Sequence, residues 1–362
     1  MNKNVFGIDL GTTYSCIAYV DEHGKPIVLK NMDGALTTPS VVYFESETNI
    51  VVGEEAKRCL EVEPEKTVAF IKRKMGKSDN IVNVDGNLYT AQEISSYILR
   101  KIVKDAESEL KQRRVIGEEE SIKDVVITCP AYFGLDERNA TTSAGELAWL
   151  NVLGIINEPT AAAISYGAIN RDKNETVLIY DLGGGTFDIT IININNGNID
   201  VICTGGNDQL GGKDWDEAII KFFVSKFYRE KNVDVSRDID TMQTLYIEAE
   251  KAKKSLTMRE KTPVAIHHRG ERLKFDFTRR DFEMITRELL NRTKVMVNEC
   301  LEVAASKGYK LSDIDKFLLV GGSSKMPQIS AMIEREYHVK PILQEPDEAV
   351  AKGAAIYAQN MQ

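Results

Sequence analysis

The sequence has few cysteines, and their spacing excludes the usual cysteine-based scaffolds. The chain carries 5, at Cys16, Cys59, Cys129, Cys203 and Cys300, an odd number without a Cys-x-x-Cys pair. Disulfide frameworks and structural zinc sites both need cysteines in recognisable pairs. We therefore expect free thiols and a reducing compartment, the cytoplasm.

Long apolar runs and an excess of basic charge are also lacking. No stretch reaches the roughly 20 apolar residues of a membrane span, and the opening MNKNVFGID enters a predicted strand without the apolar core of a signal peptide. Acidic residues outnumber basic ones by 55 to 46, for a net charge of -9. Nucleic acids and anionic membranes attract clustered Lys and Arg, so neither is expected as the main partner.

Strands and helices are predicted to alternate over the 362 residues. This length exceeds one ordinary core, and the alternation is typical of a layered α/β protein, so we expect two lobes. Strands are predicted at 5–10, 15–20, 27–30, 40–44, 124–130 and 154–159, at the start of 316–327, and as hairpins over 177–203, turning at Asn196-Gly197, and around Arg269-Gly270. Helices are predicted after the capping-box pair Thr90 and Glu93, at 136–149, 213–230, 241–257 and 279–305, and after Pro346.

A repeated hairpin is the main observation. VFGIDLGTTYSCIAYV, residues 5–20, and VLIYDLGGGTFDITI, residues 177–191, each run from a strand into an aspartate, a glycine-rich turn and a second strand. The two aspartates, Asp9 and Asp181, lie nearly half the chain apart. A supersecondary unit repeated at this distance indicates two related lobes that face each other.

The residues of these turns suit a polyphosphate. Glycine lets backbone N–H groups approach a phosphate closely, so Gly11, Thr12 and Thr13 in one turn and 183–186 in the other could hold it from two sides. The two aspartates would repel such a ligand unless a cation intervened. Mg²⁺ fits, because it prefers one or two carboxylates together with phosphates and water.

Several charged residues have both a chemical and a plain structural interpretation. Glu158 follows an apolar strand, where it could orient an attacking water or be a solvated loop residue. Lys72 could neutralise a phosphoryl group or belong to a solvated basic run. Four residues share one helix face that is either solvated and salt-bridged or part of a binding site: Glu250, Lys253, Lys254 and Thr257.

Two further pairs are similarly open. Gly321 and Gly322 follow the strand FLLV, where they could allow a flat ring to approach the backbone or could form an ordinary turn. His267 and His268 are adjacent and cannot easily share a metal ion, so we expect both to be exposed hairpin residues.

Taken together, eight segments resemble the nucleotide-binding domain of the 70-kDa heat-shock chaperone family, of the DnaK type. In family order they are GIDLGTTYS (7–15), CPAYF (129–133), IINEPTAAAISYG (155–167), YDLGGGTFDI (180–189), LGGKDWD (210–216), EKAKKSL (250–256), LLVGGSSKMP (318–327) and EPDEAVAKGAA (345–355). The resemblance implies the two-lobed α/β fold shared with actin and sugar kinases, in which helices flank a mixed sheet in each lobe.

The resemblance also implies domain bounds. Lobe I would span 1–168 and include a trimmed small subdomain at about 31–95. Lobe II would span 169–362. Within it, the second phosphate hairpin would cover 177–192, the small subdomain about 212–290 and the adenosine motif 316–327. The peptide-binding domain of the family is expected to be absent from this sequence.

Site roles follow from the resemblance, residue by residue. Asp9 and Asp181 would face a hydrated Mg²⁺, while Tyr14 and Asp188 could help bind K⁺. The catalytic set would be Lys72, Glu158, Asp181, Thr186 and Asp188, with Lys72 at the γ-phosphate and Glu158 and Asp188 organising the attacking water. The phosphate-binding set would be Gly11, Thr12, Thr13, Tyr14, Gly183, Gly184, Gly185, Thr186, Gly211 and Gly212. The adenosine-binding set would be Glu250, Lys253, Lys254, Thr257, Gly321, Gly322, Ser323, Lys325 and Asp347.

The sequence departs from the family pattern at a few of these positions. Lys325 stands where the family usually has Arg, and Lys254 where many members have Arg. A lysine cannot stack on adenine as a planar guanidinium does, so we expect weaker nucleotide binding. Lys213 and Asn207 replace acidic residues, which changes local contacts but not the fold.

The function implied by the resemblance is an ATP-hydrolysing switch of a molecular chaperone. Water would attack the γ-phosphate slowly, and lobe rotation would report the ATP or ADP state. Pro130 and Arg138 match a pair that transmits this state to the peptide-binding domain. Expected partners are a J-domain co-chaperone and a nucleotide exchange factor, with peptide clients reached only through the missing domain. The alternatives are a small-molecule kinase of the same fold and a stand-alone nucleotide-sensing scaffold.

Overall fold

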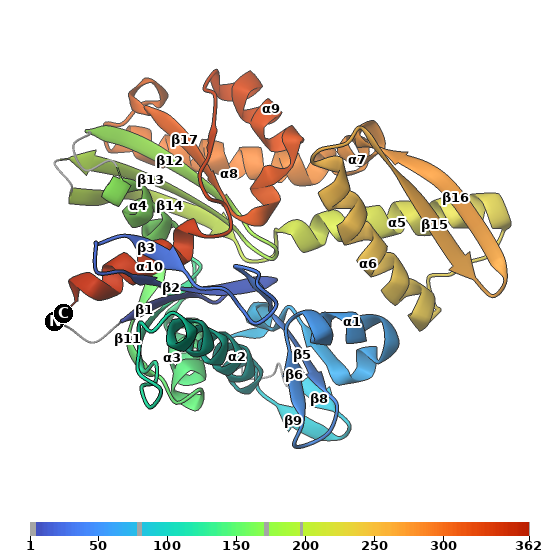
Figure 1. The fold of residues 1–362 in the computed structure, drawn as a ribbon. Coiled ribbons are helices and arrows are strands. Elements are labelled where there is room, and N and C mark those ends of the chain that lie inside the picture. The colour runs from blue at the N-terminus through green and yellow to red at the C-terminus, as the bar shows by residue number, and fades with distance from the viewer. Residues whose placement is uncertain (1–4, 78–81, 170–173, 196–197, 362) are drawn as a thin grey trace.

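The computed structural model describes residues 5–77, 82–169, 174–195 and 198–361. The predicted Asn196-Gly197 turn lies outside these residues. The described part of the chain forms the expected α/β architecture, with one mixed sheet in each lobe (Figure 1). None of its helices is long and apolar enough to cross a bilayer.

The central sheet of lobe I contains the first predicted hairpin. Its strand order is β11-β10-β1-β2-β3, with β4 paired to β2. β1 pairs antiparallel with β2 and parallel with β10. The strands are β1 (Phe6–Asp9), β2 (Tyr14–Val20), β3 (Pro26–Val28), β4 (Thr38–Pro39), β10 (Asp124–Cys129) and β11 (Asn151–Asn157).

The central sheet of lobe II repeats this arrangement around the second hairpin. Its order is β14-β13-β12-β17-β18, and β12 pairs antiparallel with β13 and parallel with β17. The strands are β12 (Glu175–Leu182), β13 (Phe187–Asn195), β14 (Asn198–Asn207), β17 (Lys316–Val320) and β18 (Ile342–Leu343). Both hairpins therefore bring an aspartate to the end of a central strand, as the repeat predicted.

Two helices lie between the sheets and join the lobes. α4 (Glu158–Ile169) packs on β12 and β13, and α10 (Ala349–Asn360) packs on α4, β1 and β2 (Figure 1). The packing is close: a Cβ on Gly353 would lie 1.6 Å from the carbonyl oxygen of Ala161. The last helix, which we expected in lobe II, therefore contacts the lobe I sheet directly.

The outer faces are covered by separate helices. On lobe I these are α2 (Ala91–Gln112) and α3 (Leu135–Leu147), and on lobe II α8 (Arg287–Ser306) and α9 (Pro327–Tyr337). The capping box at the start of α2 is confirmed: the Thr90 hydroxyl accepts a hydrogen bond from Glu93 N at 3.2 Å, and Glu93 Oε2 accepts one from Thr90 N at 2.7 Å.

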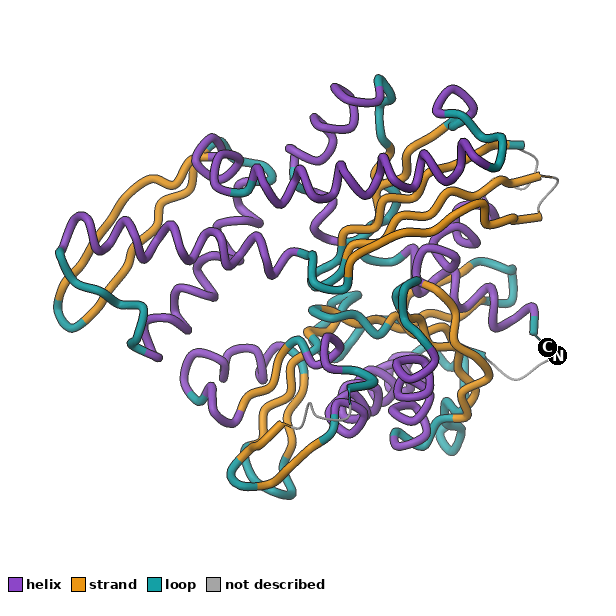
Figure 2. Tube along the Cα trace, turned by 180° about the vertical axis from the view of Figure 1, so that it is seen from behind, coloured by secondary structure: helices purple, strands orange, loops and turns teal. Residues whose placement is uncertain are grey.

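Each lobe carries a small subdomain, and the two project to the same side of the molecule (Figure 2). In lobe I it contains β5 (Val41–Phe44), β6 (Ile50–Val52), α1 (Glu54–Val62), β7 (Thr67–Ala69), β8 (Val82–Val84), β9 (Asn87–Tyr89) and 3₁₀ turns at Pro64–Lys66 and Ile71–Lys74. In lobe II it contains α5 (Gly212–Lys231), α6 (Ile239–Leu256), β15 (Lys261–His268), β16 (Glu271–Thr278) and α7 (Arg279–Ile285). Two further 3₁₀ turns lie in lobe II, at Leu311–Asp313 and Gly322–Lys325.

Two predictions in the second subdomain were wrong. The helix expected over 279–305 is divided at Thr286, whose hydroxyl donates to the carbonyl of Phe282 at 2.7 Å and competes with regular helical bonding. Of the two histidines expected to be exposed, His267 is exposed, but His268 is buried because β15 packs on α6, where His268 Nδ1 lies 2.9 Å from the Thr241 hydroxyl. The turn between β15 and β16 was predicted correctly, with positive φ at both Arg269 and Gly270.

Candidate functional site

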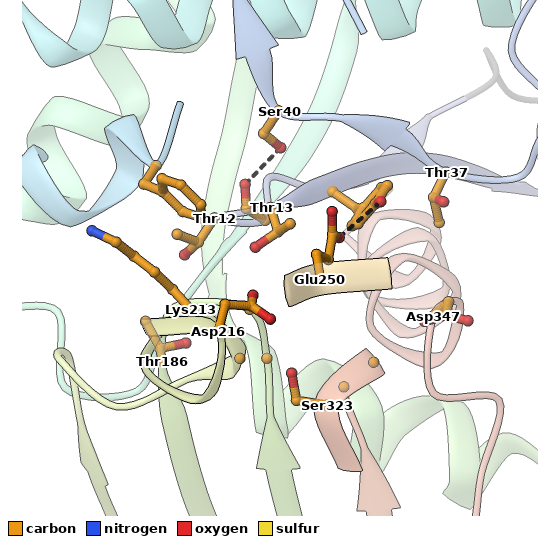
Figure 3. Close-up of a pocket in the computed structure, with 18 of the residues that line it drawn as sticks. Thr12, Thr13, Thr37, Ser40, Thr186, Lys213, Asp216, Glu250, Ser323 and Asp347 are labelled. Carbon is orange, nitrogen blue, oxygen red and sulfur yellow. Dashed lines mark hydrogen bonds between the residues drawn. The ribbon is translucent and has the colours of Figure 1, made fainter. Parts of the chain in front are cut away.

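The tips of the two repeated hairpins meet beside a cavity of about 510 Å³, and residues of both turns line it. Figure 3 shows Thr12 and Thr13 on one side of it and Thr186 and Ser323 on the other. The predicted site residues that line the cavity are Asp9, Gly11, Thr12, Thr13, Tyr14, Lys72, Glu158, Asp181, Gly183, Gly184, Thr186, Gly212, Glu250, Lys253, Lys254, Thr257, Gly321, Gly322, Ser323, Lys325 and Asp347. Three predicted residues, Gly185, Asp188 and Gly211, are not among the lining residues.

The two hairpins interlock through threonines on one side and glycines on the other. A Cβ on Gly184 would lie 1.7 Å from Thr13 Oγ1 and 2.6 Å from Thr13 Cβ, and one on Gly185 would lie 2.4 Å from Thr12 Cγ2. Gly211 in turn packs on Gly185, where an added Cβ would be 2.5 Å from the Gly185 backbone. Only a bare backbone fits these contacts, so the glycines let the lobes approach each other.

A hydroxyl network supports the lobe I turn from behind. Gly11 N donates to Ser15 Oγ at 3.1 Å, and Ser40 Oγ donates to the Gly11 carbonyl at 2.8 Å. Ser15 and Ser40 also contact each other at 2.9 Å. Ser15 and Ser40 are both buried, and their hydrogen bonds hold the turn in place beside the cavity.

The inner end of the cavity is strongly acidic. Asp9, Asp181 and Glu158 line it, and Asp188 lies opposite Asp181 in the strand register. The buried Lys72 forms an ion pair with Glu158. Burial, reinforced by the charge of Glu158, raises the pKa of Asp9 to about 7 and that of Asp188 to about 8. Burial followed by the same repulsion also raises the pKa of Asp181. The interpretations of Glu158 as a solvated loop residue and of Lys72 as part of a solvated run were therefore wrong.

Specific donors hold two of these carboxylates in place. The Thr128 hydroxyl donates to Asp9 Oδ1 at 3.1 Å, and the backbone N–H of Ala131 donates to Asp188 Oδ1 at 3.0 Å. Two nearby oxygens, Asp188 Oδ2 and Thr13 Oγ1, are buried without a partner among the described residues. This end of the site thus combines excess negative charge with unsatisfied oxygen ligands, a combination that suits a hydrated cation.

The α6 face is held by ion pairs that cross the cleft. Glu250 lies 2.5 Å from Lys57 of α1 and 2.8 Å from Lys254, and both ammonium groups contact the Tyr14 hydroxyl. Burial opposes ionisation of Glu250, but the two lysines lower its pKa to about 2. Lys253 is buried against Asp216 at 2.7 Å. The salt bridge of the solvated-face interpretation is thus present, between Glu250 and Lys254, and Lys254 is exposed, but Lys253 is buried, so the face is not fully solvated.

The opposite wall is formed by the turn after β17. Gly321 has a φ of 81°, and a Cβ there would lie 2.5 Å from both Asp181 Oδ1 and the Leu182 carbonyl. Lys325 forms an ion pair with Asp347 at the half-exposed rim. This wall thus presents bare backbone at Gly321 and an ion pair, Lys325–Asp347, at the rim.

The residues predicted to bind K⁺ and to transmit the nucleotide state have defined contacts. Of the two residues predicted to help bind K⁺, the Tyr14 hydroxyl contacts Lys57 and Lys254, and Asp188 accepts a hydrogen bond from the backbone of Ala131, so their role in K⁺ binding stays a prediction. Arg138 donates to the carbonyl of Phe133 at 2.9 Å. It therefore reaches the turn that begins at Pro130, while its role in signalling stays a prediction.

Sequence reasoning missed several residues of the site. Arg73 crosses the cleft to the Gly185 carbonyl, at 2.7 Å from Nη2, and to Asp214 Oδ2, also at 2.7 Å. Phe70 packs edge-on against Tyr246, and Lys213 Nζ lies 4.9 Å from the Phe70 ring centroid. Arg73 directly follows Lys72, which was a usable signal, whereas nothing local marks Lys57 or Tyr246.

Known proteins resemble this chain over almost its whole length. The family model described as "Hsp70 protein" matches residues 5–362. The chain is 45% identical over 364 residues to the chaperone protein DnaK of Thermotoga neapolitana, covering 98% of this chain and 59% of that protein. It is 44% identical over 361 residues to the DnaK of Thermosipho melanesiensis, with the same two coverages. This chain thus spans 59% of the length of these relatives.

Proposed function

Because this chain belongs to the Hsp70 protein family, we propose that it binds ATP and ADP in the interlobe cavity and hydrolyses ATP slowly. The observation that carries the proposal is the buried Lys72–Glu158 ion pair at the closed end of a cavity whose walls are two glycine-rich turns. The turns offer backbone N–H groups to phosphates, and Lys72 offers a buried positive charge beside Glu158.

The same residues divide into three tasks. Thr12, Thr13 and the turn at 183–186 hold the phosphates, with Gly211 and Gly212 backing the turn. Lys72 stabilises the negative charge that develops on the terminal phosphate. Glu158 and Asp188 orient the attacking water, for which Asp188 Oδ2 is a buried oxygen with no other partner in the described chain.

The adenosine would lie between α6 and the turn after β17. Glu250, Lys253, Lys254 and Thr257 form one wall, and Gly321, Gly322, Ser323, Lys325 and Asp347 the other. The bare backbone at Gly321 and Gly322 allows a flat base to approach closely. The weaker binding expected from Lys325 and Lys254 remains part of the proposal.

The acidic residues fit a magnesium ion. No group of three or more His, Cys, Asp or Glu side chains in the described chain forms a metal cage, and Mg²⁺ characteristically needs none when phosphates and water complete its shell. Asp9 and Asp181, with raised pKa values, would face it. When bound, Mg²⁺ neutralises phosphate charge. Tyr14 and Asp188 would help to bind K⁺.

The relatives are named as chaperone proteins, and the wider role is proposed by analogy. We propose that lobe movement couples nucleotide state to a peptide-binding domain. Proposed partners are a J-domain co-chaperone and an exchange factor. The domain bounds and the cytoplasmic location stay predictions.

Single-turnover hydrolysis tests the proposal. ATP is supplied with Mg²⁺ and K⁺ but no acceptor, and wild type is compared with Lys72→Ala and with the matched control Lys74→Ala, an exposed lysine two positions on. We expect slow hydrolysis in wild type and in the control, and a loss of at least about 100-fold in Lys72→Ala with ATP still bound.

Other outcomes select the alternatives. Tight ATP binding without hydrolysis in wild type would contradict the proposal and favour an acceptor-dependent kinase or a nucleotide-sensing scaffold. A small-molecule kinase would then show turnover on adding a hydroxyl acceptor, and a scaffold would show nucleotide-dependent assembly instead.

A further inference from the structure

Two buried cysteines from distant parts of lobe II lie in contact. Cys203 of β14 and Cys300 of α8 are 97 positions apart in sequence, and their Sγ atoms are 2.9 Å apart. Cys203 Sγ also lies 3.3 Å from the carbonyl oxygen of Cys300. Of the other buried thiols, Cys16 Sγ lies 3.6 Å from the Asp347 carbonyl, and Cys129 Sγ lies 3.9 Å from Asn157 Oδ1. The scattered sequence positions of the cysteines gave no indication of this pair.

A β-bulge aims Cys203 at α8. The β13–β14 register passes from Ile192 opposite Val201 to Ile191 opposite Cys203, which leaves Ile202 as the extra residue. Adjacent residues of a regular strand face opposite sides, but here Ile202 and Cys203 are both buried in the same hydrophobic cluster as α8. The bulge thus places the thiol against the helix.

A lysine completes the local environment. Lys307, which follows α8, contacts the carbonyl oxygen of the bulged Ile202. The hydrogen bond from the Cys300 thiol lowers the pKa of Cys203 against the effect of burial, and the nearby Lys307 charge acts in the same direction. The same contact, together with burial, raises the pKa of Cys300. Cys203 is accordingly the better nucleophile of the two, because the thiolate is the reactive form.

We propose that Cys203 and Cys300 form an oxidisable dithiol that a peroxide converts into an intramolecular disulfide. The Cys203 thiolate attacks one peroxide oxygen, the O–O bond breaks, and protonation of the leaving oxygen yields water and a Cys203 sulfenic acid. The Cys300 sulfur then attacks the Cys203 sulfur. The S–S bond forms, the S–O bond breaks, and the hydroxide leaves as water with the Cys300 proton. Two thiols lose two electrons, and one peroxide becomes two waters.

The bond would close a loop that contains the small subdomain of lobe II. α5, α6, β15, β16 and α7 all lie between the two cysteines in sequence. A cross-link across so long a loop restricts the unfolded chain and stabilises the folded one where native geometry permits the bond. Since the two sulfurs are already in contact, we expect the oxidised protein to unfold at a higher temperature than the reduced protein.

Peptide mapping of the intact wild-type protein tests the proposal without any substitution. Reduced protein is treated with hydrogen peroxide, small enough to enter through local opening, then unfolded in iodoacetamide and digested without reductant. We expect a peptide pair joined through Cys203 and Cys300, while Cys129, which is also buried but contacts Asn157 Oδ1, is recovered in alkylated form.

Variants sharpen the test. In Cys203→Ser the linked pair is lost and Cys300 becomes alkylated, whereas Cys59→Ser retains the link. Lys307→Gln slows disulfide formation relative to Lys310→Gln, an exposed neighbour. Oxidation of other cysteines without a Cys203–Cys300 link in wild type would overturn the proposal, as would a link that joins different cysteines. A linked protein that melts below its reduced form would contradict the expected fit to native geometry.

Discussion

The hairpins of the two lobes share their strand pairing but present different chemistry to the cavity. In lobe I, Asp9 lies opposite Cys16 in the register, while in lobe II Asp181 lies opposite a second carboxylate, Asp188. The donor to Asp188 is the Ala131 N–H, which belongs to lobe I. The lobe II hairpin therefore carries two neighbouring carboxylates, and one of them is hydrogen-bonded to a backbone N–H of lobe I.

The turns differ in a complementary way. Lobe I brings the side chains of Thr12 and Thr13, and lobe II brings the bare backbone of Gly184 and Gly185, onto which the threonines close. Two copies of one supersecondary unit have thus become two unlike halves that fit together. If this complementarity matters, changing one half should affect binding more than changing an equivalent residue elsewhere.

The largest effect is expected from Gly184→Ala. The added Cβ would overlap Thr13, so the lobes must move apart and the affinity for ATP should fall by about 100-fold, the upper end of an overpacking cost. The measurement is equilibrium ATP binding. Gly205→Ala on β14 is the control, because no atom lies within 4 Å of its added Cβ. Equal affinities in both variants would show that the interlock is dispensable.

A second experiment compares Asp188 with Asp9 through the pH dependence of the free energy of unfolding. The folded-state pKa of Asp188 is raised to about 8 by burial, above an unfolded value near 3.8, so the folded state binds more protons between these limits. Stability without nucleotide or metal should therefore fall as pH rises through this window. In urea unfolding from about pH 5 to 8, Asp188→Asn should flatten this decline.

Asp9→Asn serves as the lobe I counterpart in the same experiment. Its pKa is raised less, to about 7, and the Thr128 hydroxyl supports its charged form. We therefore expect Asp9→Asn to reduce the pH-dependent loss of stability less than Asp188→Asn does, over a range that ends at lower pH. Identical pH profiles for wild type and Asp188→Asn would argue against a raised pKa at that carboxyl.

Arg73→Met should have a moderate effect. It removes the bonds that Arg73 of lobe I makes to the Gly185 carbonyl and to Asp214 of lobe II. Losing roughly 1 kcal/mol of closed-state stabilisation should speed ADP release about fivefold. Stopped-flow release of a fluorescent ADP measures it, with the exposed Arg58→Met as control. An unchanged rate of ADP release would mean that the contacts of Arg73 across the cleft do not limit the opening of the lobes.

The smallest effect is expected from Lys325→Arg. The Lys325–Asp347 pair lies at the half-exposed rim, where ion pairs contribute little, but a guanidinium could stack on the base. ADP should bind about two- to threefold more tightly. Lys340→Arg, at an exposed position, controls for the substitution itself. Weaker binding by Lys325→Arg would show that the site is adapted to an ammonium group.

Local sequence determined the two hairpins, the capping box of α2 and the tight turn at Arg269-Gly270. Each depends on residues a few positions apart, where glycine conformation, strand alternation and side-chain capping act directly. The ordered motifs further predicted which residues line the cavity, and most of them do.

Only the tertiary structure decided which charges are buried and what they contact. Lys72 and Glu158 are 86 positions apart, Lys57 and Glu250 are 193 apart, and Cys203 and Cys300 are 97 apart. No local pattern encodes such pairs, because burial and electrostatic partners arise only when distant segments pack together. For the same reason His268 appeared to be an exposed hairpin residue until α6 placed Thr241 beside it.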